Sequence, residues 1–277
     1  MLIRSILFTP ATRLDRLPRA LASGADLVIL DLEDGVGETD KGAARTAVAS
    51  LASQGFDGAA DKLGLRINTL SSERGIRDMA MLLDCATWPS VLVLPKVNAA
   101  AEVAQAVALI ATRETRLLIT LETARGIACA HGTLSGAPKS ALVGYGSADH
   151  MAETGGTMQP ESLAWGRAQV VNAAASAGIP ALDGVWLDYT DEAGLVAEAR
   201  LVQSMGFSGK IAIHPDQIGP INAVFSPTAE EVETAREMVA AAKAARGGVF
   251  SFNGKMVDAP VLARATRLLD YTDRSIQ

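Results

Sequence analysis

The stretch RLLITLE, at residues 116–122, is a short apolar run that ends in an acid. Seven more short apolar runs occur at nearly even spacing, most of them with a polar or charged residue at the end, and an alanine-rich stretch of helical length separates most neighbours. In chain order the eight runs are residues 3–10, 27–34, 63–68, 90–96, 116–122, 141–149, 184–189 and 210–215. A strand followed by a helix, repeated eight times, predicts an α/β protein with a (β/α)8 TIM barrel.

The chain continues beyond the eighth run. A turn at Ser226, Pro227 and Thr228 opens a further helix, and a last helix begins near Asp258. We therefore expect a TIM-barrel catalytic domain over residues 1–225 and a C-terminal helical extension over residues 226–277. Because the extension is too small to build a core of its own, it should pack on the barrel or on a neighbouring subunit.

Composition excludes several classes of partner. The formal net charge is −6, which argues against nucleic acid, because neutralising phosphates requires a basic surface. The first apolar run begins at residue 3, and the start of the sequence lacks the features of a signal peptide. No apolar run reaches the roughly 18 residues of a membrane span. Two cysteines without metal-ligand spacing, Cys85 and Cys129, are typical of a reducing compartment. We expect a cytoplasmic protein without a membrane partner.

Two acids end consecutive runs, Glu122 the fifth and Asp149 the sixth. The carboxyl ends of barrel strands meet at one face, so their side chains should lie close together. Two carboxylates and water molecules suit Mg²⁺, with Mn²⁺ as an alternative. The competing interpretation is that both acids cap helices or form surface ion pairs. His150 is either a third ligand or an incidental neighbour.

An arginine stands inside the third run, where burial is costly unless the charge is paired. Arg66 can be an anion clamp for substrate oxygens, or a structural partner of Asp31 or Glu33. Both interpretations hold together if the two acids orient the guanidinium. A direct metal role for Asp31 or Glu33 is the alternative.

Two further cations are candidate substrate-binding residues. Arg13 is the arginine of the first expected helix nearest the barrel mouth, and it would suit a phosphate-bearing ligand. Lys96 follows Pro95 at the end of the fourth run. A solvated surface position is the alternative for each.

Eight motifs occur in order: RSILFTP, DLEDG, LRIN, LPK, LETARG, GYGSAD, GFSGKIAIHPDQI and NGKMVDAP. Together they resemble the citrate lyase β-subunit-like enzymes of the HpcH/HpaI aldolase and citrate lyase family, over nearly the whole chain. The resemblance implies a Mg²⁺-dependent barrel that makes or breaks a C–C bond next to a thioester carbonyl. The implied substrates are β-hydroxyacyl-CoA esters such as malyl-, citramalyl- or citryl-CoA.

The same resemblance implies roles for individual residues. Glu122 and Asp149 would hold the metal, and Arg66 and Glu122 would contact the substrate. Asp258, in the MVDAP motif, matches a lid aspartate that acts as acid–base on a neighbouring subunit. The implied catalytic set is therefore Arg66, Glu122 and Asp258, in a homo-oligomer that is a trimer or a multiple of one.

Three alternatives remain open at the level of sequence. The chain could serve a citrate lyase complex and require an acyl carrier protein. It could be a non-catalytic binding or regulatory relative. It could also be a metal-dependent aldolase that acts on free hydroxy-oxo acids without coenzyme A.

Overall fold

The computed structural model describes residues 3–245 and 248–275, and these fold into two compact units. The first unit, Ile3–Val224, holds eight strands and the helices between them. The second unit begins at Phe225 and holds two long helices and a two-stranded hairpin. The boundary expected from the sequence lies one residue further along the chain.

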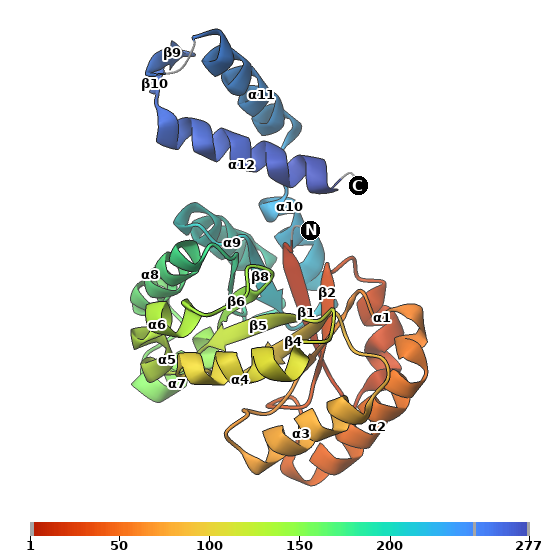
Figure 1. Ribbon diagram of the computed structural model, residues 1–277. Helices are drawn as coiled ribbons and strands as arrows, with labels where there is room; N and C mark the ends of the chain where they lie inside the picture. Colours follow the sequence, from red (N-terminus) through yellow and green to blue (C-terminus); the bar gives the residue numbers. More distant parts are fainter. Residues whose placement is uncertain (1–2, 246–247, 276–277) are drawn as a thin grey trace. The chain divides into compact units, whose positions relative to one another are not determined.

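The first unit is a closed barrel of eight parallel strands in chain order, which confirms the (β/α)8 prediction (Figure 1). The strands are β1 (Ser5–Pro10), β2 (Leu27–Asp31), β3 (Leu63–Arg66), β4 (Val91–Leu94), β5 (Arg116–Leu121), β6 (Leu142–Tyr145), β7 (Ala181–Asp183) and β8 (Gly209–Ala212). Pairing of β1 with β8 closes the ring. The C-terminal ends of all eight strands therefore meet at one rim.

Interlocking aliphatic side chains fill the barrel. Nine of them form one cluster, each no more than 3% exposed: Ile3, Ile6, Leu27, Ile29, Val91, Val93, Leu118, Leu142 and Leu182. Position 64 has no room for a side chain, because a Cβ there would collide with Ile29. The barrel interior is thus a packed core and not a channel.

Helices surround the strands (Figure 1). They are α1 (Leu17–Leu21), α2 (Lys41–Ser53), α3 (Glu73–Asp84), α4 (Ala100–Ile110), α5 (Ala124–Ala128), α6 (Ala130–Leu134), α7 (Ser147–Thr154), α8 (Pro160–Ala177) and α9 (Glu192–Met205), with 3₁₀ turns η1 (Leu14–Arg16), η2 (Glu38–Asp40), η3 (Gly55–Gly58) and η4 (Pro215–Gln217). Ser72 caps α3 and Thr123 caps α5. Each hydroxyl accepts a hydrogen bond from the backbone N–H of the residue three positions later. Helices α8 and α9 end at Gly178 and Gly206, both with positive φ.

Helix α10 (Ile218–Phe225) carries the chain to the boundary between the units. The second unit contains α11 (Ala229–Ala244), β9 (Phe250–Phe252), β10 (Lys255–Val257) and α12 (Ala259–Ser275). Asn253 and Gly254 have φ of 49° and 73°, as the two-residue turn of a hairpin requires. Among the helices of the described residues, none combines the length and the apolar character needed to cross a membrane.

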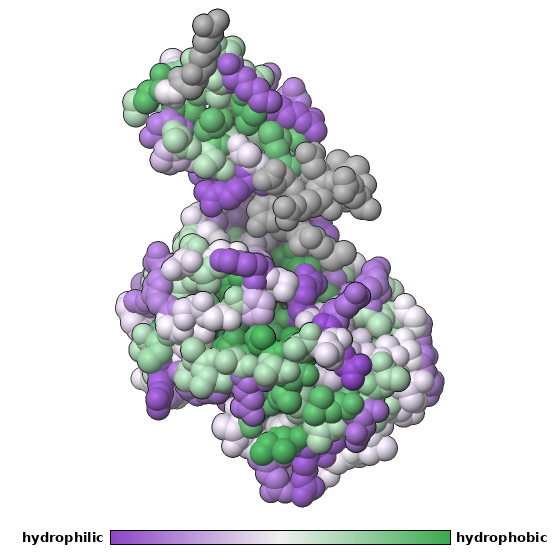
Figure 2. Space-filling view, viewed as in Figure 1, coloured by the Kyte–Doolittle hydropathy of each residue, from purple (hydrophilic) through white to green (hydrophobic). Residues whose placement is uncertain are grey.

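Apolar side chains reach the surface over α3 (Figure 2). Ile76 is 61% exposed and Leu83 is 43% exposed. Residues seven apart share one face of a helix, so the two form an outward stripe. Met79 and Leu82, on the other face, are buried.

Two of the expected runs were placed wrongly. The run at residues 184–189 is a loop, and the seventh strand is the three residues before it. A three-residue strand is too short to show a period of two. The run at residues 141–149 divides into β6 and the first turn of α7, so Asp149 lies on a helix.

Candidate active site

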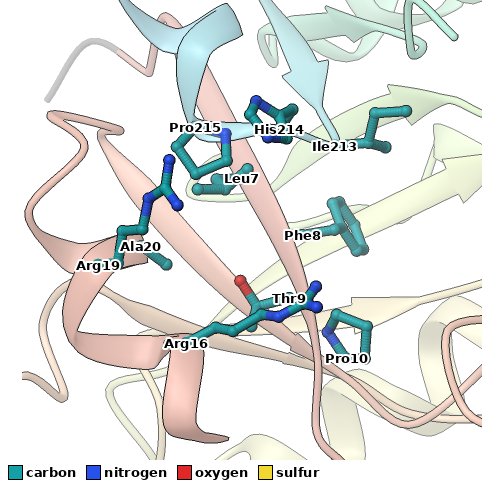
Figure 3. A pocket seen from close by; sticks show the side chains of 10 residues that line it. All are labelled: Leu7, Phe8, Thr9, Pro10, Arg16, Arg19, Ala20, Ile213, His214 and Pro215. Carbon is teal, nitrogen blue, oxygen red and sulfur yellow. The ribbon is translucent and has the colours of Figure 1, made fainter. Parts of the chain in front are cut away.

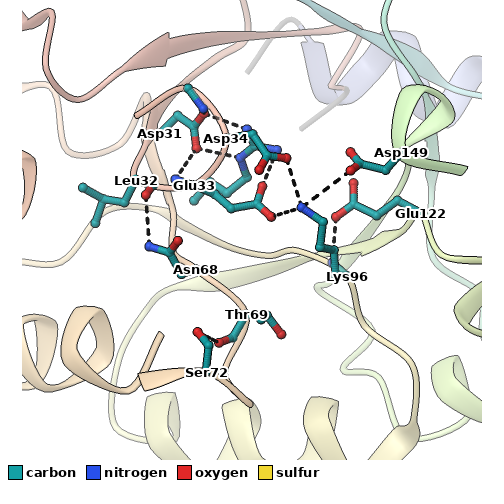
Figure 4. A network of polar contacts seen from close by, with 12 residues as sticks. Asp31, Leu32, Glu33, Asp34, Asn68, Thr69, Ser72, Lys96, Glu122 and Asp149 are labelled. Carbon is teal, nitrogen blue, oxygen red and sulfur yellow. Dashed lines mark hydrogen bonds and ion pairs between the residues drawn. The ribbon is translucent and has the colours of Figure 1, made fainter. Parts of the chain in front are cut away.

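Charged side chains gather at the rim where the strands end (Figure 4). They come from β2 and β3 and from the segments after β2, β4, β5 and β6: Asp31, Glu33, Asp34, Arg66, Lys96, Glu122 and Asp149. We call these seven residues the rim cluster. The parallel register contributes to it, because Asp31 pairs directly with Arg66 across β2 and β3. Five acids face two bases, so the cluster carries an excess of negative charge.

Glu122 follows β5 directly and is only 2% exposed. Its Oε1 accepts a hydrogen bond of 2.7 Å from the backbone N–H of Lys96. Burial, reinforced by repulsion from Glu33 and Asp149, raises the pKa of Glu122 to about 8. A Cβ at position 146 would collide with this carboxylate, so Gly146 provides the space that Glu122 occupies.

Asp149 reaches the rim from the first turn of α7, and its side chain is 37% exposed. Its Oδ1 lies 3.6 Å from Nζ of Lys96. The N-cap of α7 is Gly146, and no side chain of the described residues caps this helix. The positive end of the helix dipole favours a negative charge at this position.

Arg66 ends β3, and two acids fix its guanidinium. Its Nε and Nη2 donate to the two carboxylate oxygens of Asp31 over 2.7 and 2.6 Å, and its Nη1 forms an ion pair of 2.9 Å with Glu33. The ring of Phe8 lies 4.8 Å below the guanidinium carbon. Burial opposes the charge, but the acids prevail and raise the pKa of Arg66. The guanidinium is therefore charged and oriented at the rim.

Lys96 lies between the acids of the rim cluster (Figure 4). Its Nζ donates to Glu33 and to Asp34, the latter over 3.0 Å, and also approaches Asp149. Burial opposes the charge here too, but the hydrogen bond to Glu33 and the neighbouring acids raise the pKa of Lys96. A protonated amine is not a nucleophile, so this lysine is not suited to a Schiff base.

A buried lysine supports the loop that carries Glu33. Lys41, at the start of α2, donates from Nζ to the carbonyl oxygens of Leu32 and Glu33 over 2.8 and 2.5 Å, and to Asn68 Oδ1 over 3.0 Å. These bonds hold the backbone after β2 in place. A lysine at the start of a helix is typical of a solvated face, so the sequence carries no signal for this role.

A cavity of about 310 Å³ opens at the C-terminal end of β1 (Figure 3). Arg16, Arg19 and His214 contribute its polar groups, and β1 contributes much of its apolar wall. Phe8 both lines the cavity and stacks on Arg66, so the cavity adjoins the rim cluster. Cationic groups on a largely apolar wall suit a ligand with anionic and apolar parts.

Arg13 is not among the residues that line this cavity. Its Nε and Nη2 donate to the carboxylate of Asp15 over 2.9 and 2.8 Å, and both side chains are exposed. The first expected helix, which was to include Arg13, is instead a 3₁₀ turn at Leu14–Arg16 followed by a short helix at Leu17–Leu21. Arg16 and Arg19 line the cavity instead.

Two family models match the chain. The model described as HpcH/HpaI aldolase/citrate lyase matches residues 4–215, and the one described as C–C bond lyase of the TIM-barrel fold matches residues 167–272. The chain belongs to the HpcH/HpaI aldolase/citrate lyase family.

Relatives cover the chain almost completely. The citrate lyase subunit beta-like protein of Mycobacterium tuberculosis is 36% identical over 270 residues, which are 95% of this chain and 93% of that protein. The mitochondrial citramalyl-CoA lyase of Mus musculus is 31% identical in an alignment 287 residues long that covers 96% of this chain and 85% of that protein. The solved structure of CitE from M. tuberculosis with magnesium, acetoacetate and coenzyme A has a TM-score of 0.80 and 34% identity, and covers 97% of both chains.

In this member of the HpcH/HpaI family, the rim suits a hard divalent cation. Among the side chains that the structure describes, no three from His, Cys, Asp or Glu converge as metal ligands. Mg²⁺ needs only one or two carboxylates and keeps several waters, so Glu122 and Asp149 suffice. Burial, and after it repulsion from Glu33 and Asp149, raises the pKa of Glu122, so a cation beside this carboxylate would favour its charged form. His150 bonds instead to Tyr145, with Nδ1 and the hydroxyl 2.8 Å apart.

Asp258 lies in the second unit, between β10 and α12. Its Oδ1 accepts a hydrogen bond of 3.2 Å from the backbone N–H of Val261, the pattern of a helix cap. The acid–base role expected for Asp258 stays a prediction.

Proposed function

We propose that this protein is a Mg²⁺-dependent carbon–carbon lyase that cleaves a short β-hydroxyacyl-CoA, or forms it in the reverse direction. The products of cleavage are acetyl-CoA, or a homologue, and a 2-oxo acid. One observation carries the proposal: a buried, uncompensated Glu122 and a nearby Asp149 share the barrel rim with an oriented Arg66. The relatives named citramalyl-CoA lyase and citrate lyase subunit beta-like protein support the reaction class.

Glu122 and Asp149 are the proposed metal ligands, for Mg²⁺ or for Mn²⁺. The metal would supply Lewis-acid polarisation of the substrate oxygen that becomes the keto group. The backbone N–H of Lys96 and the space left by Gly146 fix the carboxylate of Glu122 before any ligand arrives. A preset carboxylate needs no reorganisation during the reaction.

Arg66 is the proposed stabiliser of the enolate. When the C–C bond breaks, its electron pair passes to the thioester group and places negative charge on the carbonyl oxygen. A preorganised donor at such an oxygen typically contributes about 3 kcal/mol. Asp31 contacts Nε and Nη2 of the guanidinium and Glu33 contacts Nη1, and the N–H groups that remain on Nη1 and Nη2 would serve the ligand.

Asp258 is the proposed acid–base group. Its carboxylate takes the proton of the substrate hydroxyl, the O–H electrons form the new C=O bond, and the C–C bond breaks. A proton then returns to the enolate carbon and gives the acyl thioester. In reverse, the same groups perform a Claisen-type addition to a 2-oxo acid.

The cavity beside the rim is the proposed site for coenzyme A. The phosphates of coenzyme A would contact Arg16 and Arg19. The apolar wall would contact the rest of the coenzyme A molecule, up to the thioester. Phe8 connects this cavity to Arg66, which supports one continuous substrate site. The CitE structure that holds magnesium, acetoacetate and coenzyme A is consistent with a ligand set of this kind.

A substrate panel tests the function directly. Purified protein with Mg²⁺ is given malyl-, citramalyl-, β-methylmalyl- and citryl-CoA, and release of the free 2-oxo acid is followed. We expect turnover of at least one ester, and loss of turnover with a chelator. Lack of turnover with every CoA ester, together with turnover of a carrier-bound ester, would favour a subunit that depends on an acyl carrier protein.

The second unit is proposed to complete the site of a neighbouring subunit in a homo-oligomer, a trimer or a multiple of one. Arg66→Ala and Asp258→Asn each remove one catalytic group from a different unit. If sites are shared, a mixed oligomer of the two inactive variants regains part of the activity. Absence of rescue in verified mixed oligomers would assign Asp258 to the site of its own chain.

We also propose a cytoplasmic location. Cys85 and Cys129 are both free thiols, which suits a reducing compartment. Fractionation of cells that make the protein would test the location.

A further inference from the structure

Lys96 contacts both proposed metal ligands at once. Its backbone N–H donates to Oε1 of Glu122 over 2.7 Å, and its Nζ lies 3.6 Å from Oδ1 of Asp149. Two other acids, Glu33 and Asp34, accept hydrogen bonds from the same ammonium group (Figure 4). One residue therefore joins four carboxylates of the rim cluster.

The backbone of Lys96 has an unusual conformation that makes this possible. Its φ is 52°, in the left-handed region that residues other than glycine rarely adopt. Strained backbone of this kind persists where surrounding contacts hold it and is concentrated at functional sites. Here the conformation directs the N–H to Glu122 while the side chain extends toward Asp149.

The other base of the rim cluster cannot take this place. Arg66 is committed to Asp31 by two hydrogen bonds and to Glu33 by an ion pair. Within the described residues, Lys96 is thus the side-chain cation that contacts Asp149. A metal ion at Asp149 would repel an ammonium on the same carboxylate, because both carry positive charge.

We propose that Lys96 is a tethered counter-ion of the metal site, which compensates the carboxylates in the metal-free protein and competes with the divalent cation for Asp149. The inference rests on the proposed metal ligands Glu122 and Asp149. When the metal binds, the ammonium leaves Asp149 and keeps Glu33 and Asp34. Metal affinity is therefore lower than the carboxylates alone would give, which makes metal uptake readily reversible.

Lys96→Met tests the inference, because it removes the ammonium and keeps the backbone N–H and most of the side-chain volume. Calorimetric titration with Mg²⁺ at pH 8.5 should show binding about tenfold tighter than in the wild type, since a competing charge has been removed. The rise in Tm at saturating Mg²⁺ should also be larger. If Lys96→Met does not fold, Lys96→Gln carries the same expectation.

Two controls match the change. Lys62→Met removes an exposed lysine directly before β3, at the opposite end of the strands from the rim, and should leave affinity within about twofold of the wild type. Lys96→Arg keeps the charge and should not show the tighter binding.

The outcomes separate the inference from the proposed function. Wild-type protein that binds Mg²⁺, with Lys96→Met and Lys96→Gln no tighter than wild type, overturns the counter-ion role and leaves the metal site intact. Absence of Mg²⁺ uptake in the wild type and in both neutral variants overturns the metal site as well.

Discussion

Two groups of buried charge in the barrel unit are built in opposite ways. We call the first the wall cluster, four side chains that join β7 and β8 to α8 and α9: Arg167, Asp183, Glu198 and Lys210. In the wall cluster each base contacts both acids over 2.6–3.0 Å, and no side chain is more than 4% exposed. The rim cluster has five acids for two bases, and two of its acids are open to solvent.

The pKa values reflect the same contrast. At Asp183 burial opposes the charge, but Lys210 and Arg167 prevail and lower the pKa of the carboxyl. At Glu122 burial and neighbouring acids prevail and raise the pKa to about 8. The wall cluster balances its charges and joins strands to helices. An unbalanced cluster at an open rim is suited to receive a cation.

The largest effect is expected from Glu122→Ala, which should separate function from stability. Turnover of the CoA ester should fall by at least about 10³-fold, because the metal loses its buried ligand. The fold should remain, because the removed group is an uncompensated acid. Steady-state kinetics, with circular dichroism and urea unfolding on the same sample, measure both.

A matched acid in the rim sharpens this result. Asp34→Ala removes a partly exposed carboxylate that contacts Lys96 and is not a proposed ligand, and it should cost far less activity. Equal losses in the two variants would contradict the separate role of Glu122.

Asp183→Ala in the wall cluster should have the reverse effect, a loss of stability with little change in turnover. Arg167 and Lys210 would keep buried charges without one of their two acids, which typically costs about 3–5 kcal/mol of unfolding free energy. Urea unfolding measures the loss. Turnover per folded molecule should change little. Asp15→Ala, which breaks an exposed pair with Arg13, should hardly affect stability, and a similar loss there would remove the distinction between buried and exposed pairs.

More of the rim cluster than of the wall cluster can be predicted from the sequence. Glu122 and Arg66 could be located in advance because each interrupts or ends an apolar run where the repeat predicts the barrel mouth. Lys210 and Arg167 resemble ordinary surface charges in the sequence, and only the packing of α8 and α9 on the strands buries them. The position of Lys96 Nζ depends on a left-handed φ, which residue preferences do not predict for lysine.

The free energy of unfolding of the metal-free protein should depend on pH through Glu122. The pKa of Glu122 is raised from its ordinary 4.5 to about 8, so the folded state holds this proton more tightly than the unfolded state. The resulting destabilisation is absent below pH 4.5, grows as the pH rises, and is complete above pH 8. In EDTA, Glu122→Gln should therefore gain about 2 kcal/mol or more over the wild type between pH 5 and pH 8.5.

Urea unfolding at the two pH values provides the measurement. Glu161→Gln, at an exposed position in the first turn of α8, is the control for the loss of one carboxylate. A constant difference between Glu122→Gln and the wild type at both pH values would mean that Glu122 is already compensated.

The smallest effect should come from Arg16, which lines the cavity and has no ion-pair partner in the described part of the chain. Unlike the charges of the wall and the rim, an exposed arginine of this kind contributes nothing to the fold through pairing. Arg16→Ala should raise KM for the CoA ester by about tenfold with kcat almost unchanged, because it removes binding that substrate and transition state share. The same acyl group on pantetheine lacks the nucleotide phosphates, so its KM should be equal in wild type and variant. An equal rise in KM for both esters would place the action of Arg16 at the acyl group instead, and the cavity would then belong to the reacting end of the substrate.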